Sequence, residues 1–516
     1  MRTVHCLIAL ASMVLSPDSR AQDRIWHVDG ENDMDALGGR LDFLSDLDGD
    51  GLQELLLGAW THQCDPNVFP PDGIAYEHSI VGGVLNEWCG EAEGLSLGLT
   101  ALQDVDGDGI PDFALGGPSF EDPNLGPSTG RVRVFSARTG AQLLEVRGEL
   151  PDIAFGQSIA GLPDLNGDGY PELLASAPGY LSGAGYVKVV STKDGEILRQ
   201  HFGAGPFGHF GQIVAAVGDV DRDGIDDYAI HADLTSGQKG RLFVYSAATG
   251  ALLWKVTGSY TSDYLGISIS DGGDVDGDGY ADVICGGQTG STNGGHLDGY
   301  SGKTGALLFR IDAWAALEQL GISCDMVGDA NGDGVGDYLV GAIGNKHDGH
   351  MAGRATLYSG KSLRPIYTFY PGYSNALFGG TVRGGVDFNR DGINDFVIAA
   401  YGNGWPAIGG RVSIFAGNDL YLQADDTNPL PGDFVTFDTR GGSAGSFAEL
   451  VLVDVNGTSV FAPLDYGFLD ANGELASTLC IPDDATGLDF TVISYAVKLT
   501  HKPKWNDSSA VVISVQ

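Results

Sequence analysis

An acidic nine-residue loop occurs seven times in this chain, at intervals of 55 to 60 residues. Each copy reads D-x-[D/N]-x-D-G-x-x-[D/E] and is followed at once by a short apolar segment. A period of this length indicates one supersecondary unit that is repeated in a solenoid, a propeller or an array. The copies span residues 46–54, 104–112, 164–172, 219–227, 274–282, 329–337 and 387–395.

The spacing of oxygen-bearing side chains within the loop predicts a site for a hard cation such as Ca²⁺. In the first copy Asp46, Asp48 and Asp50 supply carboxylates at positions 1, 3 and 5, and Gly51 permits a sharp turn. Position 7 offers only its backbone carbonyl, and position 9 completes the set. The predicted ligands are Asp46, Asp48, Asp50, Leu52 and Glu54; Asp104, Asp106, Asp108, Ile110 and Asp112; Asp164, Asn166, Asp168, Tyr170 and Glu172; Asp219, Asp221, Asp223, Ile225 and Asp227; Asp274, Asp276, Asp278, Tyr280 and Asp282; Asp329, Asn331, Asp333, Val335 and Asp337; and Asp387, Asn389, Asp391, Ile393 and Asp395.

Two other interpretations of the loop fit the sequence less well. Metal-free Asp-Gly turns would crowd several carboxylates in each loop, and each pair ~4 Å apart costs roughly 1 to 4 kcal/mol depending on exposure. An EF-hand needs a Glu at position 12, but this chain places apolar residues there, such as Leu57 and Val340. The residues around that position form short apolar runs, which are typical of strands covered on both faces. We therefore predict up to seven bound Ca²⁺ ions.

The repeat resembles the FG-GAP repeat of integrin alpha chains and of many bacterial secreted proteins. In Phe155-Gly156, Phe210-Gly211 and Phe378-Gly379 the glycine stands eight residues before the acidic loop. Three other copies have Leu-Gly at this place, and the second copy departs, with Gly98 only six residues ahead. The resemblance covers roughly residues 24–417. It implies a seven-bladed β-propeller with calcium in its loops, but no activity.

The expected fold is all-β, with a propeller followed by a smaller domain. The segment 24–28 resembles the last strand of other units, so we expect it to complete the seventh blade and close the ring. From about Asn418 the repeat ends, and about seven alternating segments predict a small immunoglobulin-like β-sandwich. The predicted organisation is a signal peptide at 1–21, the propeller at 22–418 and the sandwich at 419–516.

The N-terminal segment predicts secretion. An apolar stretch at 6–15 follows Arg2 and His5, and Ser19-Arg20-Ala21 has the small-x-small pattern of a cleavage site. No other stretch reaches about 18 apolar residues, so no transmembrane segment is predicted. The net charge of −40, with no basic stripe, argues against a nucleic-acid partner.

The cysteines divide into two groups. Cys64 and Cys89 flank the insertion of the first repeat, and an oxidising compartment would allow them to pair. Cys285, Cys324 and Cys480 stand in apolar, strand-like contexts and are predicted to be buried thiols.

Strands of an up-and-down blade alternate in direction, so the metal loops and the longest connections are expected on opposite faces of the ring. His231 replaces the Gly, Ala or Ser of other units, and we expect it near the axis, as a structural residue or lining the channel. Aromatic residues on the second face suit carbohydrate or protein recognition, although they could simply pack the connections. These residues are Trp60, Tyr76, Tyr180, Tyr264, Trp314, Tyr373 and Trp405.

These observations predict a secreted, calcium-binding propeller that acts as an extracellular or surface recognition or adhesion module for a protein or glycan. The alternatives are a propeller enzyme acting on polysaccharide or lipid, and a purely structural envelope protein. No catalytic residue is assigned. Clustered titratable residues opposite the metal loops would favour the enzyme, and a shallow aromatic face would favour binding.

Overall fold

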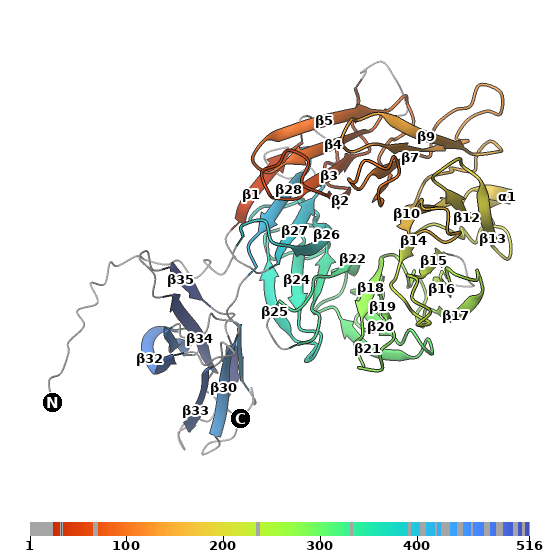
Figure 1. Cartoon of the computed structure of the whole chain (residues 1–516). Coiled ribbons are helices and arrows are strands. Elements are labelled where there is room, and N and C mark those ends of the chain that lie inside the picture. Colours follow the sequence, from red (N-terminus) through yellow and green to blue (C-terminus); the bar gives the residue numbers. More distant parts are fainter. Residues whose placement is uncertain are drawn as a thin grey trace, which may run out of the picture.

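The computed structural model describes residues 24–30, 32, 35–64, 71–233, 238–330, 334–390, 394–402 and 409–417, and the backbones of strands between 421 and 514. Seven four-stranded antiparallel sheets follow one another around a ring, as Figure 1 shows. This is the seven-bladed propeller that the repeat predicts. The signal peptide predicted at 1–21 lies outside the described residues.

Each blade runs from an inner strand A to an outer strand D, and the A strands of successive blades contact one another around the ring (Figure 1). The strands in the order A to D are, for blade 1, β2 (Arg40–Leu44), β3 (Glu54–Ala59), β4 (Ile74–Ser79) and β5 (Gly83–Cys89); for blade 2, β6 (Gly98–Ala101), β7 (Phe113–Gly117), β8 (Arg131–Phe135) and β9 (Gln142–Arg147); for blade 3, β10 (Ile159–Leu162), β11 (Glu172–Ala177), β12 (Tyr186–Ser191) and β13 (Ile197–Phe202); for blade 4, β14 (Val214–Ala216), β15 (Tyr228–Ala232), β16 (Arg241–Tyr245) and β17 (Leu252–Thr257); for blade 5, β18 (Ile269–Gly273), β19 (Asp282–Gly287), β20 (His296–Tyr300) and β21 (Leu307–Asp312); for blade 6, β22 (Leu320–Met326), β23 (Tyr338–Ala342), β24 (Arg354–Tyr358) and β25 (Pro365–Phe369); and for blade 7, β26 (Phe378–Val386), β27 (Asp395–Ala400), β28 (Arg411–Phe415) and β1 (Arg24–Asp29). A single short turn, α1 (Tyr180–Gly183), interrupts this pattern between β11 and β12.

The B strands carry the core. Every residue of β3, β11 and β19 is buried, because neighbouring blades cover both faces of these strands. The apolar clusters accordingly span two blades: Leu339 of blade 6 packs in one cluster with Ile398 of blade 7. A single blade therefore has no core of its own, as expected for a repeat whose units bury their faces only on each other.

The N-terminal strand closes the ring. Strand β1 pairs antiparallel with β28, with Trp26 opposite Ile414 and Val28 opposite Val412. The Arg411 guanidinium donates to both oxygens of Asp29, at 2.5 and 2.8 Å. The predicted closure by segment 24–28 is confirmed, and β1 lies beside β28 in Figure 1.

In six of the seven repeats, a glycine eight residues before the acidic loop joins its blade to the preceding one. The N–H of Gly156 donates to the carbonyl of Ser176, which is position 13 of its own unit counted from the first Asp. The same glycine lies against position 13 of the preceding blade, since a Cβ on Gly116 would be 2.0 Å from the Gly156 oxygen. Small residues occupy position 13 for this reason, and crowding near the axis is not the cause.

The second repeat keeps this register, which corrects the prediction that it departs with Gly98. Ser96 stands eight residues before Asp104, with φ +72 in the left-handed region that glycine occupies in the other copies. It is fully buried, and its hydroxyl donates to the carbonyl of Ile74 at 2.9 Å. A Cβ on Gly58 would meet Ser96 at 2.9 Å, so the same contact forms here. The side-chain hydrogen bond offsets part of the cost of a positive φ in a residue with a Cβ.

His231 occupies position 13 of blade 4 and is buried, with 1% of its surface exposed. Its ring lies beside Gly266 of the next blade, whose added Cβ would be 3.1 Å from Cδ2 of His231. The prediction that this residue could line the central channel is therefore wrong.

Four blades contain a buried ion pair that the sequence analysis missed. The acidic partner stands three residues before the junction glycine, or before Ser96 in blade 2, and the basic partner belongs to the same blade. The pairs are Asp35 with His62 at 3.1 Å, Glu93 with Arg131 at 2.6 Å, Asp263 with His296 at 2.9 Å and Glu318 with Arg354 at 3.2 Å. These are the four blades in which Leu replaces the Phe before that position.

The pair in blade 5 is the most enclosed. His296 is fully buried, and its two ring nitrogens lie 2.9 Å from Asp263 and 3.1 Å from Asp298. Burial alone would lower the pKa of His296, but both carboxylates together outweigh it and raise the pKa to about 9. Arg310 and the Tyr300 hydroxyl also bind Asp298. His296 is thus charged at neutral pH.

The C-terminal strands form two antiparallel sheets. One contains β29 (Tyr421–Ala424), β30 (Phe434–Arg440) and β33 (Leu475–Cys480), and the other contains β31 (Phe447–Val455), β32 (Thr458–Phe468), β34 (Asp489–Lys498), β35 (Lys504–Asp507) and β36 (Val511–Ser514). Strand β35 was not predicted. The immunoglobulin-like class stays a prediction, since the side chains of these strands are not described.

A disulfide joins Cys64 and Cys89, as the sequence allowed. Cys285 and Cys324 are buried thiols, as predicted, whereas the side chain of Cys480 lies outside the description. Within the described residues, no helix has the length and apolar character needed to cross a membrane.

The substitution His296→Gln removes the charge between Asp263 and Asp298. Breaking a buried charge pair costs about 3 kcal/mol or more, so the melting temperature should fall clearly at pH 6. The native pKa is about 9 and the unfolded value about 6.5, so this contribution is complete below pH 6.5 and disappears as the pH rises through 9. Melting curves at pH 6 and pH 10 test this, with His350→Gln, at an exposed residue, as the control. An equal destabilisation at both pH values would contradict a charged His296.

Candidate metal-binding loops

The acidic loops lie between strands A and B, and where all their residues are described, their own carboxylates hold them in shape. In loop 1, Asp46 accepts the N–H groups of Gly49 at 2.7 Å and Gly51 at 2.8 Å. Asp48 accepts from Asp50, and Asp50 accepts from Leu52, each through Oδ1. The same contacts recur in loop 2. The loop therefore uses one oxygen of Asp48 and of Asp50 internally and leaves the other for a ligand.

The residue at position 9 has a second role, which sequence reasoning missed. The side chain of Asp112 is fully buried, and its two oxygens accept the N–H groups of Val105 at 2.8 Å and Ala137 at 3.0 Å. Val105 belongs to the acidic loop and Ala137 to the turn between strands C and D. The corresponding Asp227, Asp282, Asp337 and Asp395 make the same two contacts. Position 9 thus joins two turns of the blade in addition to facing the loop.

Several loop oxygens lack any hydrogen-bond donor, and this fits a bound cation. Asp50 Oδ2, Asp221 Oδ1 and Glu172 Oε1 are buried and unpaired within the described part of the chain. Burial raises the pKa of Glu54, Glu172 and Asp227 to about 7 each, and neighbouring loop carboxylates add to the effect. Unpaired buried carboxylates are unfavourable unless a proton or a cation neutralises them. A divalent cation with oxygen ligands supplies this charge.

The structure brings the predicted ligands together in the first four loops. Their carboxylate oxygens lie within 4.8 Å of one another in four groups: Asp46, Asp48, Asp50 and Glu54; Asp104, Asp106 and Asp108; Asp164, Asp168 and Glu172; and Asp219, Asp221 and Asp227. In loops 6 and 7, residues 331–333 and 391–393 lie outside the described residues, so Asn331, Asp333, Asp391 and Ile393 stay predictions.

Basic side chains from the C–D turns approach the loops of their own blades. Arg138 lies 2.7 Å from Asp108, Lys303 lies 3.5 Å from Asp278 and Lys193 lies 3.7 Å from Asp168. The A–B loops and the C–D turns therefore share one face of the ring, as the alternating strand directions predict. These cations lie beside position 5 and should weaken divalent binding at those loops relative to loop 1.

Of the fifteen exposed large apolar side chains among the described residues, seven lie on the outer D strands, and the other eight are divided unequally between the two faces. The described residues of this kind in the B–C and D–A connections are Trp60, Leu125, Leu150, Leu181, Phe207, Trp314 and Leu317, whereas the A–B loops and C–D turns contribute Val81. Tyr76, expected on this face, is instead buried at 7% exposure, and Trp405 lies outside the described residues. The two faces of the ring therefore differ in the chemistry of their connections, acidic on one face and apolar on the other, as well as in which strands they join.

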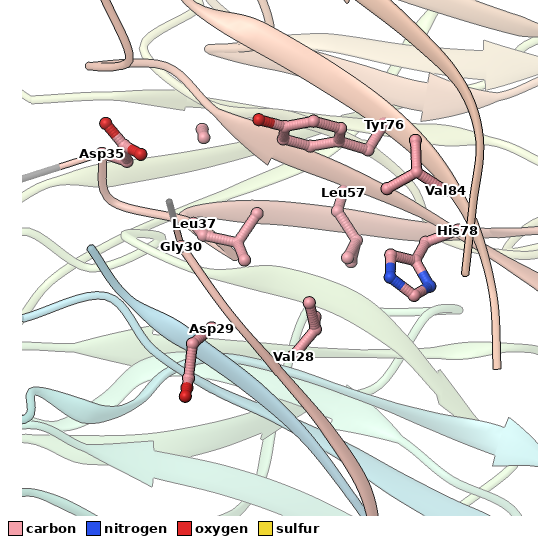
Figure 2. Close-up of a pocket in the computed structure, with 10 residues that line it drawn as sticks. Val28, Asp29, Gly30, Asp35, Leu37, Leu57, Tyr76, His78 and Val84 are labelled. Atoms are coloured by element: carbon pink, nitrogen blue, oxygen red, sulfur yellow. The ribbon is translucent and has the colours of Figure 1, made fainter. Parts of the chain in front are cut away.

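A small pocket lies where the closing strand β1 meets blade 1 (Figure 2). Val28, Leu37, Leu57 and Val84 give it mainly apolar walls, and the ring of His78 faces it. His78 places Nδ1 2.7 Å from the Ser79 carbonyl and packs edge-on against Trp26. These contacts describe a gap in the packing at the closure, which Asp29 and Asp35 also line, and burial lowers the pKa of His78.

Residues 155–190 match the family model described as the FG-GAP repeat. The chain carries an FG-GAP repeat. Integrin alpha-V from Gallus gallus is 29% identical over 205 residues, integrin alpha-5 from Xenopus laevis is 30% identical over 206 residues, and integrin alpha-IIb from Homo sapiens is 28% identical over 207 residues. Each alignment covers 36% of this chain and 19% of the integrin, so the chain matches about a fifth of the length of these relatives. The FG-GAP resemblance inferred from Phe155-Gly156 is confirmed.

Two substitutions in loop 2 distinguish metal binding from the structural role of position 9. Asp106 is exposed at position 3, so Asp106→Ala should lower the melting temperature in calcium and leave it nearly unchanged in a chelator. Asp112→Ala also removes two buried hydrogen bonds and should be destabilising by about 1 to 3 kcal/mol in both conditions.

Thermal melts of the two variants and the unmodified chain, with calcium and with chelator, test this pair. The unmodified chain should melt at a lower temperature in chelator, because an ion that binds only the folded state stabilises it, by about 1.4 kcal/mol per site at tenfold above Kd. Identical melting of the unmodified chain with and without calcium would overturn the assignment of the loops.

Proposed function

We propose that this protein is an extracellular recognition or adhesion module, in which calcium-loaded loops stiffen one face of the propeller and the opposite face binds a protein or carbohydrate. The observation that carries this proposal is that, among the described connections between strands, seven of the eight exposed large apolar side chains lie on the face opposite the acidic loops. Solvent-exposed apolar groups gathered on one face are typical of interaction surfaces.

The binding surface is centred on the connections of blades 3 and 4. Leu181 is 65% exposed, Phe207 is 62% exposed, and Phe202, at the end of β13, is 57% exposed. The Phe207 N–H donates to the Ser182 carbonyl, so the two connections that carry Leu181 and Phe207 are hydrogen-bonded to each other. A rigid pair of connections presents these side chains without a large ordering cost on binding.

Three observations support an extracellular location. The Cys64–Cys89 disulfide suits an oxidising compartment. The sequence predicts a signal peptide, and the similar curated proteins are integrin alpha chains.

The net charge bears on the class of ligand. With a net charge of −40, the chain offers little attraction to nucleic acid or anionic lipid, which leaves protein and glycan as ligand classes.

Arrays of glycans and of extracellular proteins, probed with the full chain in calcium and in chelator, test the proposal. We expect a ligand that binds in calcium and is lost in chelator. Phe207→Ser and Leu181→Ser should each weaken binding by about tenfold or more without changing the melting temperature. The matched control is Val81→Ser, which alters an equally exposed apolar residue on the loop face.

Two outcomes would contradict the assignment of the face. One is a ligand whose binding falls with Val81→Ser and is unchanged in both face variants. The other is the absence of any calcium-dependent ligand on either array, which would favour a purely structural protein.

A further inference from the structure

Two imidazoles and one carboxylate lie together where blades 3 and 4 meet, on the face opposite the acidic loops. His231 is in β15, Asp233 follows that strand, and His209 is in the connection from β13 to β14. Nε2 of His231 lies 3.6 Å from Oδ1 of Asp233, and Nδ1 of His209 lies 3.2 Å from Oδ2 of the same residue. A single carboxylate therefore stands between two histidine rings.

The ring of His231 is buried without a hydrogen bond. Only 1% of the residue is exposed, and neither ring nitrogen has a hydrogen-bond partner among the residues that the structure describes. The 3.6 Å approach to Asp233 is too long to count as one. Burying an unpaired polar group costs about 1 to 3 kcal/mol. The His231 ring therefore lacks a hydrogen-bond or ligand partner within the described chain, and a bound ligand would supply one.

Two glycines make room for the imidazoles. A Cβ on Gly183 would lie 2.9 Å from ring atoms of His209, and a Cβ on Gly266 would lie 3.1 Å from the ring of His231. The carbonyl of Gly183 also accepts the N–H of His209 at 2.7 Å. Both rings are consequently seated against backbone, which limits their movement.

We propose that His209, His231 and Asp233 form a binding site for a transition-metal dication, with Zn²⁺ as the preferred ion. Imidazole and carboxylate are ligands that Zn²⁺ takes at about 2.0–2.1 Å, which places neighbouring ligand atoms about 3.3 Å apart in a tetrahedron. The two observed separations, 3.2 and 3.6 Å, are close to that distance but run to the two different oxygens of Asp233, so a small rotation of the carboxylate is needed to bring one oxygen and both nitrogens around a single ion. The donor set differs from the all-oxygen loops on the other face, which select a hard cation.

The site is specific to one blade and open on one side. Position 13 is Gly, Ser or Ala in the other six units, so blade 4 supplies the one imidazole at this place. The side chain of His209 is 41% exposed and that of Asp233 is 19% exposed. Three protein ligands with access from solvent leave a fourth position for water or for an acidic group of a bound molecule. This inference does not depend on the proposed recognition function.

Zinc titration of the full chain in excess calcium tests the site, because calcium occupies the acidic loops. Competition against a chromogenic zinc chelator should show one bound Zn²⁺, and Co²⁺ should give the visible absorption of a low-symmetry imidazole site. His209→Asn removes a ligand at a residue with φ +41, a conformation that Asn tolerates. This variant and Asp233→Asn should each weaken zinc binding by more than about 100-fold, since loss of an outer-sphere partner alone costs 10- to 100-fold.

The matched control is His350→Gln, at an exposed histidine outside the cluster, which should bind zinc as the unmodified chain does. His231→Ser should also abolish binding, and it restores the residue type of the other units. Should that variant fail to fold, His209→Asn decides the question, because its side chain is partly exposed. The proposal is overturned if no zinc binds in excess calcium, or if His209→Asn and Asp233→Asn bind zinc as tightly as the unmodified chain.

Discussion

The ring depends on one close contact that recurs at every blade junction. The residue eight before an acidic loop lies against position 13 of the preceding blade, and at each junction at least one of the two is glycine. A Cβ on Gly286 or Gly341 would lie 1.8 Å from the carbonyl oxygen of the facing glycine, Gly321 or Gly379. Where position 13 carries a side chain, as in Ser176 or His231, the facing residue is glycine. One missing Cβ per junction therefore sets the distance between blades, and a residue with a Cβ is tolerated on only one side.

Calcium chemistry and folding are coupled through position 9 of the loop. Because the buried carboxylate of Asp227 binds the N–H groups of Val220 and Ala247, it connects the acidic loop with the C–D turn. Burial raises the pKa of Asp227 to about 7, so the bare loop holds a carboxylate that is easily protonated. A cation in the loop would keep this group ionised while its oxygens still accept the two hydrogen bonds. Asp227 thus joins the two turns of its blade when no metal is bound, and it also contributes negative charge to the loop when a cation is bound.

Most of the architecture could be predicted from the sequence because it rests on periodic features. The loop spacing predicts the number of blades, and the likeness of segment 24–28 to a D strand predicts the closure. What escaped prediction depends on neighbours distant in sequence. Ser96 adopts the glycine conformation because its hydroxyl reaches Ile74, and Glu93 is buried because Arg131, 38 residues later, pairs with it. The predicted position of His231 beside the channel is wrong for the same reason, because Gly266 of the next blade covers the ring.

At two junctions an arginine of one acidic loop reaches the acidic loop of the next blade. In loops 4 and 7 an arginine with positive φ replaces the glycine at position 4. Arg390 donates across the closure junction to the Asp50 carbonyl, and Arg222 lies over the Tyr280 ring at the junction between blades 4 and 5. The first is the junction beside the non-covalent closing strand, and the second accommodates the bulky His231. A cation that reaches the next loop adds an attraction between blades at the closure junction and beside the bulky His231.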